Sequence, residues 1–193
     1  MTRKPFDAAV VGAGPNGLAA ALALQATGRS VVLYESRGRV GGGLWTDELT
    51  LPGFHHDTCS AIHPMAMASP YLRTLPLVDH GLEWIHPEIP LAHPLDDRPA
   101  ALLHRDIAQT AASLGMDAAR YERWMSPLVA DWKALMRAGM GPPAWPGSPG
   151  VLARFALSAA MPATTLARAR FDDDAAQALI AGLAAHSVLP LEH

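Results

Sequence analysis

The stretch VVGAGPNGLAAA at residues 10–21 places three glycines between an apolar run and an alanine-rich segment. Residues 6–11 are largely apolar up to the first glycine, which is typical of a buried parallel strand. Residues 15–26 are typical of a helix, and SVVLYE at residues 30–35 is typical of a second strand. Two such strands joined by one helix predict a right-handed parallel crossover, so the chain opens with a predicted βαβ unit.

Each glycine of this turn has a separate physical task. Gly12 permits the tight turn, and Gly14 lets the backbone approach a pyrophosphate. Gly17 lets the helix pack closely on the strand, and Pro15 suits the first helical turn, where no N–H group is needed. The free amides and the positive dipole end of the helix can then receive phosphates. The pattern therefore predicts a dinucleotide-binding turn.

The residues after the second strand bear on which dinucleotide is bound. Glu35 ends that strand, where its carboxylate can accept hydrogen bonds from the adenosine ribose hydroxyls of NAD or FAD. The 2′-phosphate of NADP calls for arginine instead, and Arg37 and Arg39 lie close by, so charge alone leaves NADP open. The deciding feature is a second glycine cluster at residues 41–43, which favours FAD.

This second cluster resembles the ExxxxxGG extension of the two-dinucleotide-binding-domain flavoproteins, whose glycines pass close to the FAD pyrophosphate and the flavin. The stretches RVGGGLWTDELTLPGFHHD and GLAAHSVLPLE are similar to phytoene-desaturase-like FAD-dependent oxidoreductases, which are relatives of the amine oxidases. The resemblance runs along the whole chain, and its specific motifs lie in residues 8–60 and 181–192. Carried over position by position, it implies FAD contacts at Gly12, Gly14, Pro15, Asn16, Gly17, Glu35, Ser36, Arg37, Gly41, Gly42 and Gly43.

The length of the chain departs from that family. Its members are well over twice as long as 193 residues, and their later half completes both the sheet and the flavin site. Two parallel strands do not make a stable doubly wound sheet, which needs neighbouring strands and helices on both faces. We therefore expect an incomplete sheet, in an N-terminal piece of a larger enzyme or in one part of a two-chain assembly. The chain alone is expected to be inactive.

The predicted fold class is α/β, with a Rossmann-like FAD-binding βαβ start followed by a mainly helical α+β part of a substrate domain. Residues 1–50 are assigned to the FAD-binding domain and residues 51–193 to a partial substrate or cap domain, largely helical after residue 105. Short apolar runs at residues 82–85 and 101–104 predict strands.

Capping signals and helical periodicity predict the helices of the second part. Asp106 with Gln109, and Asp174 with Gln177, form capping-box pairs that mark two helix starts. In the second predicted helix, aromatic and apolar side chains recur at helical spacing and predict a face packed into the core. The helices are expected from Asp106 onward and at residues 117–137, 151–170 and 174–187, with a proline- and glycine-rich loop at residues 139–150.

The stretch FHHDTCSAIH gathers several polar side chains. His55, Cys59 and His63 recur every four residues, but flanking prolines and the lack of a fourth ligand argue against a metal site, and no metal is predicted. The family resemblance implies that the stretch enters the substrate domain near the flavin. There His56 and Asp57 are candidates to line the site, and a hydrogen-bonded polar turn is the alternative. Cys59 has no CxxC partner and is expected to be a small buried residue.

Composition excludes several classes of function. The formal net charge of −3 and the pI near 6.3, without a basic stripe, argue against a nucleic-acid partner. A single cysteine excludes an intramolecular disulfide and fits a reducing compartment. No signal peptide is recognised at the start, and no apolar stretch is long enough to span a membrane. A cytoplasmic protein is expected.

These patterns predict a FAD-dependent oxidoreductase in which a substrate C–H or C–N bond loses a hydride to the flavin. The flavin carries the chemistry, so no catalytic residue is assigned, and the family resemblance implies a small apolar substrate. The alternative is a noncatalytic nucleotide-binding subunit that pairs with a complementary chain, and a homo-oligomer is a related expectation. Membrane docking through residues 151–170 is disfavoured because Pro162 interrupts that helix.

Overall fold

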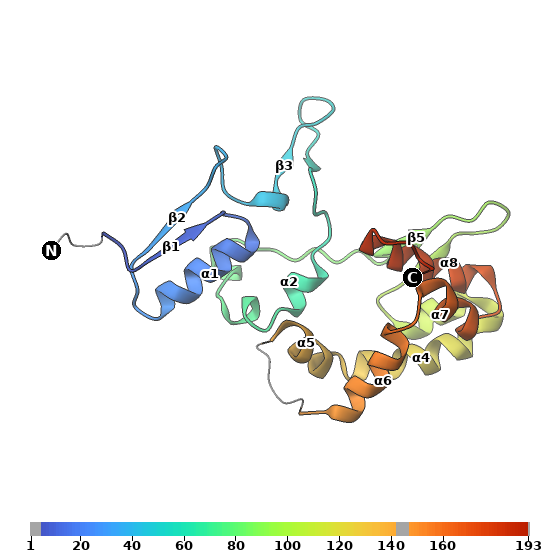
Figure 1. Cartoon of the computed structure of the whole chain (residues 1–193). Coiled ribbons are helices and arrows are strands. Elements are labelled where there is room, and N and C mark those ends of the chain that lie inside the picture. The colour runs from blue at the N-terminus through green and yellow to red at the C-terminus, as the bar shows by residue number, and fades with distance from the viewer. Residues whose placement is uncertain (1–4, 142–146, 193) are drawn as a thin grey trace. The chain divides into compact units, whose positions relative to one another are not determined.

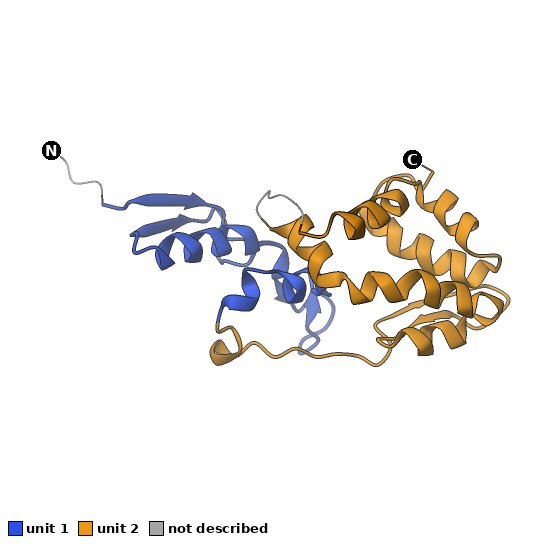
Figure 2. Ribbon diagram, turned by 90° about the horizontal axis from the view of Figure 1, so that it is seen from below, with its two compact units in different colours: residues 1–75 blue, residues 76–193 orange. Residues whose placement is uncertain are grey.

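The computed structural model describes residues 5–141 and 147–192. It divides into two compact units, unit 1 (residues 1–75) and unit 2 (residues 76–193), coloured blue and orange in Figure 2. The contact boundary therefore falls after Leu75. The assignment of a FAD-binding domain to residues 1–50 concerns function and stays a prediction.

Unit 1 begins with the predicted βαβ unit (Figure 1). Strand β1 (Ala8–Val11) and strand β2 (Val31–Tyr34) run parallel, and helix α1 (Pro15–Ala26) connects them. Among the described residues β1 and β2 pair with each other alone. The α/β prediction with a Rossmann-like start and an incomplete sheet is thus confirmed.

The beginnings of the two parallel strands are tied together by one polar pair. The carboxylate of Asp7 accepts hydrogen bonds from the backbone amide of Ser30 at 2.9 Å and from its hydroxyl at 2.8 Å. These bonds, the backbone one first, lower the pKa of the Asp7 carboxyl. The pair fixes the register of the strands at the end opposite to the glycine turn.

After β2 the chain forms short elements. A 3-10 turn, η1 (Gly42–Leu44), precedes an antiparallel hairpin of β3 (Thr46–Asp47) and β4 (His56–Asp57). Helix α2 (Pro64–Ala68) and the 3-10 turn η2 (Leu72–Thr74) complete unit 1.

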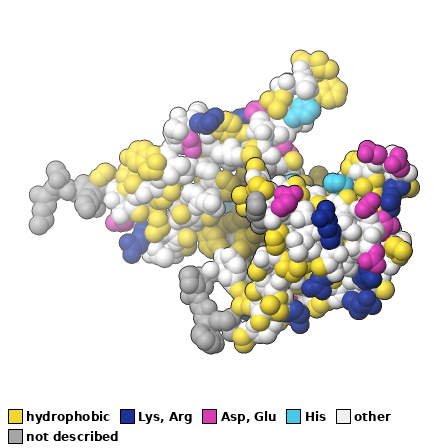
Figure 3. Space-filling view, turned by 45° about the vertical axis from the view of Figure 1, so that its right-hand side comes forward, with side chains coloured by type: hydrophobic (Ala, Val, Ile, Leu, Met, Phe, Trp, Pro, Cys, Tyr) yellow, Lys and Arg dark blue, Asp and Glu magenta, His cyan; other side chains and the backbone are white. Residues whose placement is uncertain are grey.

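Unit 1 buries few side chains completely. Among its described residues Ala13 is the one buried hydrophobic residue, whereas the side chain of Val11, at the end of β1, is 85% exposed. In Figure 3, hydrophobic side chains are seen at the surface in scattered patches among polar side chains and backbone. The two-stranded sheet therefore leaves apolar surface uncovered, as expected for strands that normally have neighbours on both sides.

Unit 2 is mainly helical. It opens with a 3-10 turn, η3 (Val78–His80), and an antiparallel pair of strands, β5 (Leu91–His93) and β6 (Ala101–Leu103). The helical elements that follow are α3 (Ile107–Ser113), η4 (Gly115–Asp117), α4 (Ala118–Ala130), α5 (Trp132–Met140), α6 (Pro149–Ala159), α7 (Ala163–Arg170), α8 (Asp174–Ala184) and η5 (Ala185–Ser187).

The core of unit 2 forms where these helices meet. Leu114, Phe171 and Leu179 are almost completely buried. Trp124 meets the ring of Phe171 edge-on at 5.8 Å between centroids, and Tyr121 lies 6.4 Å from the same ring. Tyr121 and Trp124 belong to the side chains predicted to face the core, and they do so by packing against Phe171.

The prediction of one helix over residues 117–137 is wrong, because α4 ends at Ala130 and α5 begins at Trp132. Pro127 lies inside α4, three residues before its end. Proline has no N–H group, so the carbonyl four residues earlier, on Arg123, loses its intrahelical donor. The helical hydrogen bonds nevertheless continue past the proline, since the Asp131 amide donates to the Pro127 carbonyl at 3.0 Å, and the helix ends at Ala130.

Two smaller predictions also need correction. Residues 82–85 form no strand, and Ile85 is 84% exposed there; an apolar run without a pairing partner has no ladder to join. The predicted loop at residues 139–150 is shorter than expected, because α5 continues to Met140 and α6 begins at Pro149. Residues 142–146 of that loop lie outside the described residues.

The two predicted helix starts have different outcomes. Asp106 caps α3 as predicted, accepting a hydrogen bond from the Gln109 amide at 2.9 Å. At α8 the capping residue is Asp173 rather than Asp174, and the Gln177 side chain donates to the carbonyl of Phe171 at 2.9 Å instead. The cause is tertiary: the buried carboxylate of Asp117 fixes the chain just before α8.

Asp117 is completely buried and makes this contact from the end of η4. Its carboxylate accepts hydrogen bonds from the Asp172 amide at 3.0 Å and from the Asp173 amide at 2.8 Å. Arg120 lies 3.4 Å away on the next turn and balances the buried charge. One side chain thereby joins the beginning of α4 to the beginning of α8.

The helices α6 and α7 come closest to a membrane span in composition. No single helix among the described residues has the length and apolar character needed to cross a bilayer. Together α6 and α7 would pass that test, but they are bent by 103° at Pro162.

Candidate dinucleotide-binding site

The glycine turn begins directly after β1. The amide of Gly12 donates a hydrogen bond to the carbonyl of Tyr34 at the end of β2, at 2.7 Å. Its φ angle of +95° lies in the left-handed region, where glycine carries no steric penalty. Gly12 therefore makes the tight turn that its place in the motif predicts.

The third glycine of the motif packs against this turn. A methyl group built on Gly17 would lie 1.8 Å from the carbonyl oxygen of Gly12, far inside van der Waals contact. No side chain fits at Gly17 without moving the turn away from helix α1. Its role in close helix packing is a direct consequence of this distance.

The N-terminus of α1 keeps its hydrogen-bond donors available. Gly14 is the N-cap residue, no side chain caps the helix there, and the first turn carries no acidic residue. Pro15 occupies the first helical position, and Asn16 beside it is exposed. Uncapped amides and the positive end of the helix dipole make this end suited to an anion such as a phosphate.

The second glycine cluster lies directly on the first. The Gly41 amide donates a hydrogen bond to the carbonyl of Ala13 at 2.8 Å. A methyl group on Gly42 would lie 2.9 Å from the Cα atom of Gly14, and Gly42 has a φ angle of +57°. Residues 12–14 and 41–43, distant in the sequence, thus form one glycine-walled surface at the start of α1.

Glu35 holds the glycine turn from the end of β2. One oxygen of its carboxylate accepts a hydrogen bond from the Ala13 amide at 2.7 Å. The other accepts from the Arg37 amide at 2.9 Å and from the Ser36 hydroxyl at 3.3 Å. The backbone hydrogen bond from Ala13 is the largest cause that lowers the pKa of Glu35, so the side chain is ionised at neutral pH.

This use of Glu35 goes beyond the sequence prediction, which assigned its carboxylate to a ribose. An ionised carboxylate has about four acceptor positions, and three are occupied here. One position therefore remains for a ligand hydroxyl. Ser36 and Arg37 contribute a hydroxyl and a backbone amide to the same carboxylate.

A tryptophan that the sequence analysis did not single out organises the loop between Glu35 and the glycine cluster. The guanidinium of Arg39 lies 4.0 Å from the centroid of the Trp45 ring, and that of Arg37 lies 5.4 Å from it. The Trp45 indole donates to the carbonyl of Val40 at 2.8 Å, and Arg39 also pairs with Asp47. A tryptophan close in sequence to two arginines was the available signal for this cation–π arrangement.

In the histidine-rich stretch, His56 and Asp57 form strand β4 and make side-chain hydrogen bonds to threonines. His56 shares a hydrogen bond with the Thr50 hydroxyl at 2.8 Å, and Asp57 accepts one from the Thr46 hydroxyl at 2.6 Å. The helical face that His55, Cys59 and His63 would have shared does not form. No group of three or more His, Cys, Asp or Glu residues suited to a metal was found in the described part of the chain.

The expected burial of Cys59 is wrong, because its side chain is exposed. The thiol lies on the inner edge of the second glycine cluster, 3.5 Å from where a Cβ atom on Gly43 would stand.

Comparisons with known proteins agree with this geometry. Residues 10–75 match the family described as an NAD(P)-binding Rossmann-like domain. Pyridine nucleotide-disulfide oxidoreductase domain-containing protein 2 of Mus musculus is 32% identical over 140 residues, which cover 64% of this chain and 23% of that protein. A limonene dehydrogenase of Castellaniella defragrans has a subunit that is 31% identical over 111 residues, 58% of this chain and 20% of that protein.

A shorter match has higher identity: putrescine oxidase of Kocuria rosea is 58% identical over 40 residues, 21% of this chain and 8% of that protein. Residues 10–75 thus match a Rossmann-like nucleotide-binding domain, and these relatives support an FAD/NAD(P)-dependent oxidoreductase superfamily for this part of the chain. The chain spans less than a quarter of the mouse protein and of the limonene dehydrogenase relative. The predicted superfamily is confirmed, and the narrower resemblance to phytoene-desaturase-like enzymes stays a prediction.

Proposed function

We propose that unit 1 binds the ADP half of FAD and belongs to an oxidoreductase that removes a hydride from a small apolar substrate. The pyrophosphate would lie at the start of α1, against Gly14 and the second glycine cluster. The ribose of the adenosine would meet the remaining acceptor position of Glu35. The flavin, when bound, supplies the hydride acceptor, and the residues of this chain bind and orient it.

The meeting of the two glycine clusters carries this proposal. The hydrogen bond from Gly41 to Ala13 and the approach of Gly42 to Gly14 bring two glycine-containing backbone segments together at the helix start. A single GxGxxG turn serves any dinucleotide. In the flavoproteins that the second glycine cluster resembles, these glycines pass close to the FAD pyrophosphate and the flavin. This feature favours FAD over NAD.

The surroundings of Glu35 argue against NADP. An ionised carboxylate at the ribose position would repel a 2′-phosphate. Of the two arginines that could offset it, Arg39 is paired with Asp47 and both contact the Trp45 ring. The arginines therefore support the loop conformation, and the local charge favours an unphosphorylated ribose.

The relatives' names bear on the substrate in different ways. The limonene dehydrogenase relative is named for a hydrocarbon, and putrescine oxidase is named for a diamine. The match to the first covers 58% of this chain and the match to the second only 21%, which supports the apolar substrate of our proposal.

The proposal is tested by titrating the chain with FAD, NAD and NADP and comparing the wild type with Gly14→Ala. A methyl group on Gly14 would have Gly42 as its nearest neighbour at 3.9 Å, so the fold accommodates it and a loss of binding reports on the ligand's space. We expect FAD to bind most tightly and Gly14→Ala to weaken it at least about tenfold, or about 1.4 kcal/mol. Gly38→Ala, at a loop position with open space around it, is the matched control. Preferential NADP binding, or equal FAD binding by wild type and Gly14→Ala, would refute the proposal.

A pairing subunit is the second candidate function, and one surface of unit 1 favours it. Apolar side chains of α1 and β2, including Leu18, Leu22 and Leu33, line an open hollow of about 400 Å³ beside the two-stranded sheet. A complementary chain that added strands would cover this hollow and complete the sheet. We expect light scattering to show self-association of the isolated chain. A monodisperse monomer that binds FAD tightly at one-to-one stoichiometry would exclude the need for a partner.

A further inference from the structure

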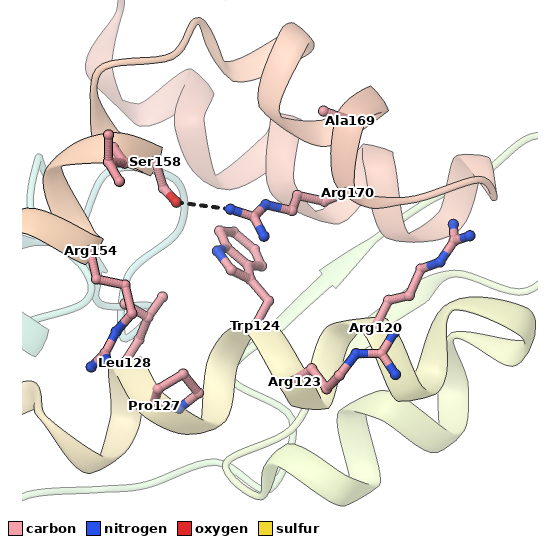
Figure 4. A pocket seen from close by; sticks show the side chains of 10 residues that line it. Arg120, Arg123, Trp124, Pro127, Leu128, Arg154, Ser158, Ala169 and Arg170 are labelled. Carbon is pink, nitrogen blue, oxygen red and sulfur yellow. Dashed lines mark hydrogen bonds between the residues drawn. The ribbon is translucent and has the colours of Figure 1, made fainter.

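A hollow in unit 2 gathers positive charge. It has a volume of about 530 Å³ and is lined by side chains from α4, α6 and α7 (Figure 4). Arg120 and Arg123 come from α4, Arg154 from α6 and Arg170 from the end of α7. No acidic residue is among those that line it in the described part of the chain. Because the whole chain has a net charge of −3, this hollow is a local exception.

Two of the four arginines have their charge satisfied within the protein. Arg120 pairs with Asp172 at 2.5 Å, and this hydrogen bond lowers the pKa of the Asp172 carboxyl. Arg154 pairs with Asp131 on the rim. These two arginines shape the hollow and add little free charge.

The other two arginines, Arg123 and Arg170, have no carboxylate within ion-pair distance among residues 5–141 and 147–192. Arg170 is instead positioned by a hydrogen bond to the hydroxyl of the largely buried Ser158, at 3.3 Å. Two unneutralised guanidinium groups in the lining of one cavity give it a positive charge that a bound anion would offset. A guanidinium presents a planar pair of donors that matches a phosphate or a carboxylate.

Apart from Ser158, the rest of the wall is apolar. Trp124 and Leu128 of α4 line the hollow, and Leu157 of α6 continues it outward with 76% of its surface exposed. An inorganic ion would make no use of this apolar rim, whereas a hydrocarbon attached to the anion would cover it.

We propose that this arginine pocket binds the phosphate or carboxylate head of an amphiphile, with Arg123 and Arg170 as the head-group ligands and the rim of α6 as the contact for the apolar chain. Such a head group occurs on a dispersed single-chain amphiphile and on an acidic lipid within a bilayer. The chemistry of recognition is the same for both sources.

The test uses three probes on the full chain: inorganic phosphate, dodecyl phosphate below its micellar concentration, and phosphatidylcholine vesicles with and without phosphatidic acid. The variant Arg123→Gln/Arg170→Gln removes the two unpaired charges. The matched control is Arg137→Gln/Arg168→Gln, which removes the same charge from the exposed faces of α5 and α7 outside the pocket. Thermal unfolding followed by circular dichroism verifies that each variant folds. If the double variant does not fold, the two single substitutions are tested in its place.

We expect the wild type to bind dodecyl phosphate one-to-one, at least about tenfold more tightly than inorganic phosphate. Arg123→Gln/Arg170→Gln should lose at least about tenfold in affinity, and the control pair should keep it. Sedimentation with phosphatidic acid vesicles but no binding of dodecyl phosphate would assign the site to a bilayer head group. Equal losses of affinity in the pocket variant and in the control variant would overturn the proposal. Equal affinity for phosphate and dodecyl phosphate would overturn the proposed contact between the apolar chain and α6. Gly14→Ala should leave amphiphile binding unchanged, which separates this site from the dinucleotide site.

Discussion

Glu35 in unit 1 and Asp117 in unit 2 make the same kind of contact in different surroundings. Each carboxylate accepts hydrogen bonds from two backbone amides and so joins segments that lie apart in the sequence. Glu35 stands at the open edge of a glycine turn, where one acceptor position remains. Asp117 is completely buried and is balanced by Arg120.

The difference separates a binding feature from a structural one. A partly open carboxylate at a helix start can exchange a ligand for water, so its hydrogen bonds prepare a site. A buried carboxylate cannot be rehydrated, so its hydrogen bonds hold the fold together. Burial of the group, more than its bonding pattern, therefore distinguishes the two roles.

The largest effect is expected from Gly17→Ala, which tests the backbone packing that Glu35 supports. The added methyl group would overlap the Gly12 carbonyl at 1.8 Å, so the turn or the helix must move. We expect unit 1 to lose more than about 3 kcal/mol of stability, together with all dinucleotide binding, in chemical denaturation and flavin titration. Gly38→Ala should behave as wild type, because its added methyl group meets open space. A Gly17→Ala protein with unchanged stability would show that the turn is looser than the structure has it.

The second-largest loss of stability is expected from Asp117→Ala, which tests the role of the buried carboxylate. The change leaves the Asp172 and Asp173 amides without their acceptor and Arg120 without one of its two carboxylates. We expect a loss of about 2–5 kcal/mol in the free energy of unfolding of unit 2. Asp97→Ala, on an exposed loop of the same unit, is the control and should change stability little. Hydrogen exchange at the start of α8 should rise in Asp117→Ala alone, and protection there equal to wild type would contradict the structural role.

A smaller, pH-dependent effect is expected from Glu35. Its pKa is lowered from the ordinary 4.5, so its stabilisation of unit 1 is fully present above that value and is lost as the pH falls through the lower folded value. Glu35→Gln should remove this part of the acid sensitivity, while the part due to Asp7, whose pKa is also lowered, remains. Thermal unfolding between pH 7 and pH 3 would measure this acid sensitivity. Identical pH profiles of stability in wild type and Glu35→Gln would mean that the Ala13 hydrogen bond contributes nothing to stability. At pH 7 Glu35→Gln should also weaken FAD binding, by less than Gly14→Ala does.

The smallest effect is expected from Arg39→Ala, which loosens the loop around Trp45. An exposed cation–π contact contributes about 0.5–1 kcal/mol and an exposed ion pair about 0–1 kcal/mol, so losing both should destabilise unit 1 by no more than about 2 kcal/mol. FAD binding should change little, and the selectivity against NADP should persist, because it depends on the charge of Glu35. A gain in NADP affinity in Arg39→Ala would contradict the account of the loop. The tryptophan fluorescence of Trp45→Phe compared with wild type would report whether the arginines stack on the Trp45 ring.

Local signals predicted much of unit 1 correctly. A short apolar run, a glycine turn and an alanine-rich segment act over neighbouring residues, so the strand, the turn and α1 could be recognised one after another. The start of α3 at Asp106 was equally local, since a cap and its amide lie three residues apart. Pro127 was also visible, but the break after α4 was missed because helical spacing of the aromatic residues continued across it.

Patterns along the chain were enough to specify the βαβ start, the glycine positions and the acid at the end of the second strand, because each depends on backbone geometry over a few residues. Tertiary packing was needed to bring residues 41–43 against residues 12–14 and to bond Glu35 to Ala13. It was likewise needed for Asp117 to set the start of α8 and for arginines of α4, α6 and α7 to face one hollow. These contacts join segments far apart in the chain, and their energy depends on burial and mutual distance, which no spacing along the sequence encodes.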